Sequence, residues 1–194
     1  MEKLKLLDEL CEPDERQKLF VVFNSETGDK RSRKLEDVYA EAKSIKLHSG
    51  VPEEIRSHFN TARNLLVYSW FFYPFNVTAQ LLAFISVEFA LKEKTCETDA
   101  SFKKLLKLAV KKKWINEKGF SHIKVNDDIS KENHLIEKDN TEAHNYCDAL
   151  VEAMPKLRNA LAHGNDMLHN RGYLSVRICA DFINQLFSES KGDN

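Results

Sequence analysis

Apolar side chains recur at helical spacing through most of the chain beyond residue 51. Within 52–73, 76–94 and 99–115, hydrophobic residues fall three or four positions apart, and charged residues occupy many of the positions between them. This spacing is typical of helices that bury one face, so the pattern predicts three helices in these ranges. Residues suited to helix boundaries stand near their ends: Pro52, Pro74, Asn76 as an N-cap and Asp99 as an N-cap.

The C-terminal third predicts two further helices. The first begins at Thr141–Glu142 and carries four apolar residues toward the core: Cys147, Leu150, Val151 and Met154. Pro155 either bends this helix or restarts it as a second one, because proline removes a backbone donor and clashes with the preceding turn. Gly164 suits the position after its end. The last helix is expected over residues 172–188, and residues 120–140 are polar enough to form a long loop.

Residues 1–50 have a mixed pattern. A short helix is predicted over residues 2–11, a strand over 19–23, a turn over 24–30 and a polar helix over 33–47. One five-residue strand cannot form a sheet by itself, so residues 19–23 either pair with an unidentified segment or form no strand. The expected architecture is therefore all-α: an antiparallel bundle of about five core helices in residues 51–194, with an irregular N-terminal extension in residues 1–50.

Composition narrows the possible functions. The net charge is −1, from 29 basic and 30 acidic residues, so binding to nucleic acid would have to be local. The start of the chain has no apolar core of a signal peptide, and polar residues interrupt the apolar region 65–91. We therefore expect a cytoplasmic protein without a membrane partner. Cysteines 11, 96, 147 and 179 lack paired spacing, so reduced thiols are expected, with no metal site and no cofactor.

Candidate chemistry is concentrated in the sequence Arg158-Asn159-Ala160-Leu161-Ala162-His163-Gly164. The guanidinium of Arg158 is always charged and suits phosphate oxygens, whereas His163 is of the residue type that transfers protons near neutral pH. On a straight helix these two residues lie about 140° apart, with a rise of about 7.5 Å between them. Asn159 shares a face with His163.

Arg158 falls within the apolar stripe of its predicted helix and therefore needs an anionic partner. Glu88 is the intramolecular candidate, because it lies within an apolar stripe of the helix predicted over 76–94. Two interpretations follow. Arg158 and Glu88 either form a sealed ion pair that only orients two helices, or they support a functional site.

The arginine–histidine motif and the helices before it resemble the HEPN superfamily, small all-helical domains named for nucleotide binding in higher eukaryotes and prokaryotes. The family pattern is Arg, a polar residue, a few further residues and then His, which Arg158, Asn159 and His163 match. The preceding helices follow in a similar order, through Ser69–Tyr73, Ser86–Leu91 and Phe102–Leu106. The resemblance covers about residues 55–188.

This resemblance implies a homodimer and a metal-independent endoribonuclease that cleaves RNA through the ribose 2′-hydroxyl, in the role of a toxin or a phage-defence effector. Arg158 would hold the scissile phosphate, His163 would transfer the proton, and Asn159 would orient ribose or phosphate. A two-fold dimer would double this small set of groups. The alternative is a non-catalytic module that binds a nucleotide or RNA, or docks a partner such as a nucleotidyltransferase antitoxin. A plain structural bundle is the third interpretation.

A basic face is predicted on the helix that begins at Asp99 and closes near Trp114–Ile115. Its lysines lie within about 100° of one another, opposite the apolar stripe: Lys103, Lys104, Lys107 and Lys111. They are candidates for contact with an RNA backbone, and a merely solvated surface is the alternative. Residues 30–34 form a second basic cluster with the same two interpretations.

Overall fold

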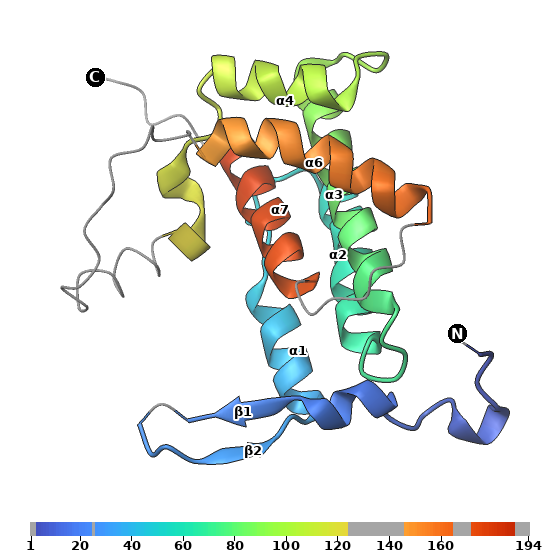
Figure 1. Ribbon diagram of the computed structural model, residues 1–194. Coiled ribbons are helices and arrows are strands. Elements are labelled where there is room, and N and C mark those ends of the chain that lie inside the picture. The colour runs from blue at the N-terminus through green and yellow to red at the C-terminus, as the bar shows by residue number, and fades with distance from the viewer. Residues whose placement is uncertain (1–2, 25, 124–145, 165–171, 189–194) are drawn as a thin grey trace.

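The computed structural model describes residues 3–24, 26–123, 146–164 and 172–188, and these are mostly helical (Figure 1). The expected all-α fold class with an irregular N-terminal region is confirmed. The α-helices are α1 (Leu35–Ser44), α2 (Glu53–Tyr68), α3 (Phe75–Thr95), α4 (Phe102–Lys111), α6 (Tyr146–Ala162) and α7 (Gly172–Leu186). Short 3-10 helices occupy Leu7–Glu9, Glu15–Leu19 and Glu117–Gly119.

Helix α3 lies at the centre of the bundle and packs against α2, α4, α6 and α7. Its completely buried alanines, Ala79, Ala83 and Ala90, leave room for close approach by neighbouring helices. Helix α7 begins beside the start of α3, where a Cβ on Gly172 would lie 3.1 Å from the side chain of Asn76. Helices α4 and α6 cross the far end of α3 in Figure 1. The second half of α3 therefore positions the side chains of α4 and α6.

The apolar character of α3 follows from this central position. By length and composition α3 could cross a membrane, yet half of its most apolar window is buried within the protein. Core helices that are covered on most sides are apolar nearly all round. Packing in the bundle therefore accounts for the composition.

The outer helices show the expected one-sided burial. Helix α2 buries Ile55, Phe59, Ala62 and Leu66, which recur at helical spacing. Helix α4 likewise buries Phe102, Leu105, Leu106 and Ala109 and leaves its lysines outside. The helix expected over 33–47 is present as α1, and the last helix is present as α7.

A two-stranded hairpin precedes α1. Strand β1 (Val21–Phe23) pairs antiparallel with β2 (Lys30–Ser32), so that Val22 lies opposite Arg31. The partner that the predicted strand lacked is therefore the basic cluster that follows the turn. The sequence did not predict β2, because Lys-Arg-Ser has no apolar alternation.

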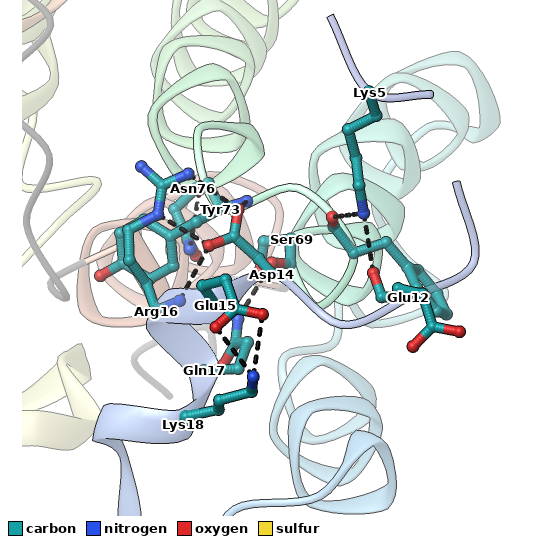
Figure 2. Close-up of polar contacts among 11 residues, drawn as sticks. Lys5, Glu12, Asp14, Glu15, Arg16, Gln17, Lys18, Ser69, Tyr73 and Asn76 are labelled. Carbon is teal, nitrogen blue, oxygen red and sulfur yellow. Dashed lines mark hydrogen bonds and ion pairs between the residues drawn. The ribbon is translucent and has the colours of Figure 1, made fainter. Parts of the chain in front are cut away.

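Asp14 fixes the N-terminal extension to the connection between α2 and α3. Its backbone N–H donates to the carbonyl of Trp70 at 2.8 Å. Its carboxylate accepts from the backbone N–H of Tyr73 at 2.8 Å (Figure 2). The carboxylate also pairs with the guanidinium of Arg16 at 2.7 Å. Burial opposes ionisation of Asp14, but the hydrogen bonds from Arg16 and Tyr73 outweigh it and lower the pKa of this carboxyl.

Two more long-range bonds secure the same corner. The buried side chain of Gln17 donates to the carbonyl of Ser69 at 2.9 Å. Lys5 donates from Nζ to two backbone carbonyls, those of Glu12 at 2.8 Å and Phe71 at 3.1 Å. Backbone groups of residues 69–73 are thus satisfied by side chains that lie more than fifty positions earlier in the chain.

Several predicted boundaries were wrong. Of the helix predicted over 2–11, the described residues 3–11 form no continuous helix, and only Leu7–Glu9 among them adopt a short 3-10 turn. Helix α2 ends at Tyr68 rather than at residue 73, because the following residues turn. Pro74, not Asn76, occupies the N-cap of α3. Ser101, not Asp99, caps α4, and its hydroxyl accepts from the backbone N–H of Lys104 at 3.4 Å.

The predictions around α6 had mixed outcomes. Helix α6 continues through Pro155 without a restart. Gly164 has a positive φ of 85°, as expected of a glycine just after a helix end. The predicted start at Thr141–Glu142 and most of the predicted loop over 120–140 lie outside the described residues.

Candidate functional site

Arg158 reaches from α6 onto the central helix α3. It follows the buried residues Leu150, Val151 and Met154 along one side of α6, so its side chain faces α3. There its Nη2 donates to Oε2 of Glu88 at 2.7 Å. The ion pair expected from the two apolar stripes is therefore present.

The pair is only partly shielded from solvent. The side chain of Glu88 is 13% exposed, whereas that of Arg158 is 33% exposed. Arg158 also donates from Nη1 to the side-chain oxygen of Asn159 at 3.0 Å. A guanidinium carries five N–H donors, and these two bonds occupy two of them. The ion pair is thus not sealed, and part of the Arg158 side chain reaches the surface.

Lys92 is a second cation at this site that the sequence analysis missed. Its Nζ lies 3.2 Å from Oε1 of Glu88, one turn further along α3. The two oxygens of one carboxylate therefore hold two cations, Arg158 and Lys92, and the three side chains carry a net charge of about +1. The spacing of four residues between Glu88 and Lys92 was the available signal.

His163 directly follows α6. Its backbone N–H donates to the carbonyl of Asn159 at 3.0 Å, and its side chain is exposed. The structure thus joins Arg158, Asn159 and Glu88 directly and places His163 five residues beyond Arg158, just after the end of α6. An imidazole in this position is accessible to a ligand or to another protein.

Only some of the lysines of α4 are available for contact with an RNA backbone. Lys103 bonds Glu152 of α6 at 2.6 Å, and Lys104 pairs with Glu97 at 3.2 Å. The hydrogen bond from Lys103 is the main cause that lowers the pKa of Glu152. Lys107 and Lys111 are also exposed on this face. The four lysines do share a surface, but acidic side chains neutralise two of them.

Acidic side chains also neutralise positive charge in the second basic cluster, residues 30–34. Arg31 forms a hydrogen-bonded ion pair with Asp37 of α1 at 2.6 Å, and Arg33 pairs with Glu41. The guanidinium of Arg31 is the main cause that holds the pKa of Asp37 at about 2. These residues stabilise the approach of the hairpin to α1, which weakens their candidacy as an RNA contact.

Metal-ligating residue types do not gather in the described part of the chain: no group of three or more His, Cys, Asp and Glu is placed to hold an ion there. The chemistry available near Arg158 is therefore that of cations, one amide and one imidazole. Such groups bind phosphate and transfer protons.

Comparisons of the chain with protein-family models, with curated proteins and with solved structures found no match. The Arg158–His163 motif and the geometry around it are therefore the features that point to a function.

Proposed function

We propose that this protein is a HEPN-like, metal-independent endoribonuclease that acts as a homodimer. The observation that carries the proposal is the partly exposed side chain of Arg158, whose guanidinium is bound by Glu88, five residues before the exposed His163. A fixed cation with donors that the described residues leave unused is suited to hold a phosphate, since little conformational freedom is lost on binding.

The proposed reaction is transesterification. The ribose 2′-oxygen loses its proton to a base and attacks the adjacent phosphorus, and the bond from phosphorus to the 5′-oxygen breaks. The departing 5′-oxygen takes a proton from an acid, which leaves a 2′,3′-cyclic phosphate and a 5′-hydroxyl. Arg158 and Lys92 stabilise the charge that accumulates on the phosphate oxygens. His163 transfers the proton, and Asn159 orients ribose or phosphate.

One histidine cannot be base and acid in the same step. The proposal therefore includes a two-fold dimer, in which His163 of one copy removes a proton and its symmetry mate supplies one. Exposure of His163 and of Lys107 and Lys111 is consistent with an RNA strand that approaches from the α4–α6 side. A toxin or defence role, with a cognate antitoxin, is part of the same proposal.

The test is cleavage of an unstructured RNA in the presence of a chelator. We expect Arg158→Ala and His163→Ala to lower the rate by about 10²-fold or more, as loss of a charge-stabilising or proton-transfer group does. Lys156→Ala is a matched control, because Lys156 is an exposed cation elsewhere on α6. A 2′-deoxy substitution at the cleaved position should block the reaction. Equal rates for wild type and both variants would refute the assignment.

A non-catalytic module is the second candidate, and a specific observation favours it: Glu88 already compensates the charge of Arg158. In that case the site would bind a nucleotide or RNA, or dock a partner, without cleavage. Fluorescence anisotropy with labelled RNA separates the two functions. For the non-catalytic module, wild type would bind the RNA and leave it intact, and Arg158→Ala would not bind it. Growth arrest on expression that Arg158→Ala relieves would instead favour the toxin.

A further inference from the structure

The N-terminal extension displays a cluster of leucines that the described residues do not cover. Leu4 is 97% exposed, Leu7 is 87% exposed, and Leu6 and Leu10 are at least half exposed. Single exposed leucines are ordinary on protein surfaces, but several within one short segment mark a contact surface.

These leucines lie on a segment that is fixed at both ends. Lys5 bonds the carbonyls of Glu12 and Phe71, and Asp14 bonds the backbone of residues 70 and 73 (Figure 2). A segment held this way offers its apolar side chains in a defined arrangement. Binding through it would cost less ordering than binding through a loose tail.

A largely apolar cavity of about 430 Å³ adjoins the leucines. Leu4 and Leu10 are among the residues of the extension that line it, together with Lys3, Lys5 and Cys11. Aromatic residues of the α2–α3 corner also line it: Tyr68, Phe71, Phe72 and Phe75. An apolar side chain presented by another molecule fits such a space. The exposed leucines of this same segment are side chains of that kind.

Charge along the segment argues for a second copy of this chain as the occupant. Lys3 and Lys5 lie at its start, and Asp8, Glu9 and Glu12 lie at its end. In a two-fold contact, residue i of one copy meets residue j of the other, and j meets i. The segment folds back, so that Lys5 bonds the carbonyl of Glu12 and basic and acidic side chains lie side by side in each copy. A two-fold contact can therefore set the basic side chains of each copy against the acidic side chains of its partner. An anionic membrane or RNA would be repelled by the acidic half.

We propose that residues 3–12 and the adjoining cavity form a two-fold contact between two copies of this protein. Leucines of each copy pack into the cavity of the other, and basic and acidic halves pair across the axis. The surface is separate from the candidate site, because Phe75 and Glu88 are about 20 Å apart along α3. The contact is therefore independent of whether the protein cleaves RNA.

The first test is the oligomeric state of the full chain, measured by sedimentation velocity over a range of concentrations. The combined variant Leu4→Ser, Leu7→Ser should lose one association step: from dimer to monomer, or from tetramer to dimer if the Arg158 face also pairs. Both leucines are almost fully exposed, so the fold should be unaffected, which circular dichroism checks. Leu157→Ser is the matched control, because Leu157 is 49% exposed on α6, away from the proposed contact. This variant should leave the contact through residues 3–12 intact.

An unchanged association state in the leucine variant, or a wild type that stays monomeric, would overturn the proposal. The second test separates a specific two-fold contact from non-specific hydrophobic association. Lys3→Glu and Asp8→Lys should each weaken association about threefold to tenfold, as rim charge pairs do. Together they should restore it, since the two exchanged charges face each other again. Additive weakening in the double variant would contradict the two-fold arrangement.

Discussion

The pairing of Arg158 with Glu88 predicts an unequal effect of removing either partner. We consider three variants: Arg158→Met, Glu88→Gln and the double variant. Each substitution keeps the approximate length of the side chain and removes its charge. In Arg158→Met, Glu88 keeps Lys92 at 3.2 Å. In Glu88→Gln, both Arg158 and Lys92 lose the carboxylate that they share.

The expected magnitudes follow from the exposure of the two side chains. Breaking a fully buried ion pair costs about 3–5 kcal/mol, whereas an exposed pair contributes about 0–1 kcal/mol. This pair is intermediate, at 13% and 33% exposure. We therefore expect Arg158→Met to lower the free energy of unfolding by about 1 kcal/mol and Glu88→Gln by about 2 kcal/mol. The coupling between the two substitutions should be about 1 kcal/mol.

Urea unfolding followed by circular dichroism measures all three variants, with Lys156→Met as the control for a charge lost from the surface of α6. A coupling free energy within error of zero would contradict this estimate and mean that the pair adds nothing measurable to stability. A loss above about 3 kcal/mol for Arg158→Met would mean that the guanidinium mainly holds the fold. The reduced cleavage expected of an Arg158 variant would then report unfolding rather than lost chemistry.

Two further predictions concern ionisable groups outside the site. Because the pKa of Asp14 is lowered in the folded state, its carboxylate stabilises the protein above the unfolded value of about 4. Asp14→Asn should therefore cost about 1–2 kcal/mol at pH 7, a difference that shrinks as the pH falls below about 4 in acid unfolding experiments. Thiol alkylation of the native protein at pH 8 should label Cys11 and Cys96, which are exposed. Burial raises the pKa of Cys147 to about 11 and also raises that of Cys179, so both should react only after unfolding; rapid native labelling of all four would contradict this burial.

Helical periodicity predicted the bundle well, because most buried positions recur within one helix. The stripe of Phe102, Leu105 and Leu106 is an example, and it was correct although its N-cap was assigned two residues too early. Helix caps were less predictable. Asn76 and Asp99 have suitable side chains, but α3 and α4 begin after Pro74 and Ser101 instead. Local preference alone does not decide among neighbouring polar residues.

The candidate site was predictable to the extent that charge within an apolar stripe demands a partner. That rule selected Glu88 for Arg158 from two helices that are seventy residues apart. It could not select Lys92, because a lysine on a half-exposed helix face needs no partner. The role of Asp14 was equally hidden, since it acts on backbone groups of a distant turn, and no side-chain pattern reveals that.

The corner held by Asp14 and Gln17 also bears on how this protein should be shortened. Excision of the first twenty residues would strip the backbone amide of Tyr73 and the carbonyl of Ser69 of their acceptor and donor. It would also uncover the aromatic rings of the corner, which Leu4 and Leu10 border. A minimal fragment that begins at α2 would thus expose apolar rings and leave backbone groups without hydrogen bonds, and it should aggregate more readily. A shortened protein should therefore be cut before Leu4 rather than after the hairpin.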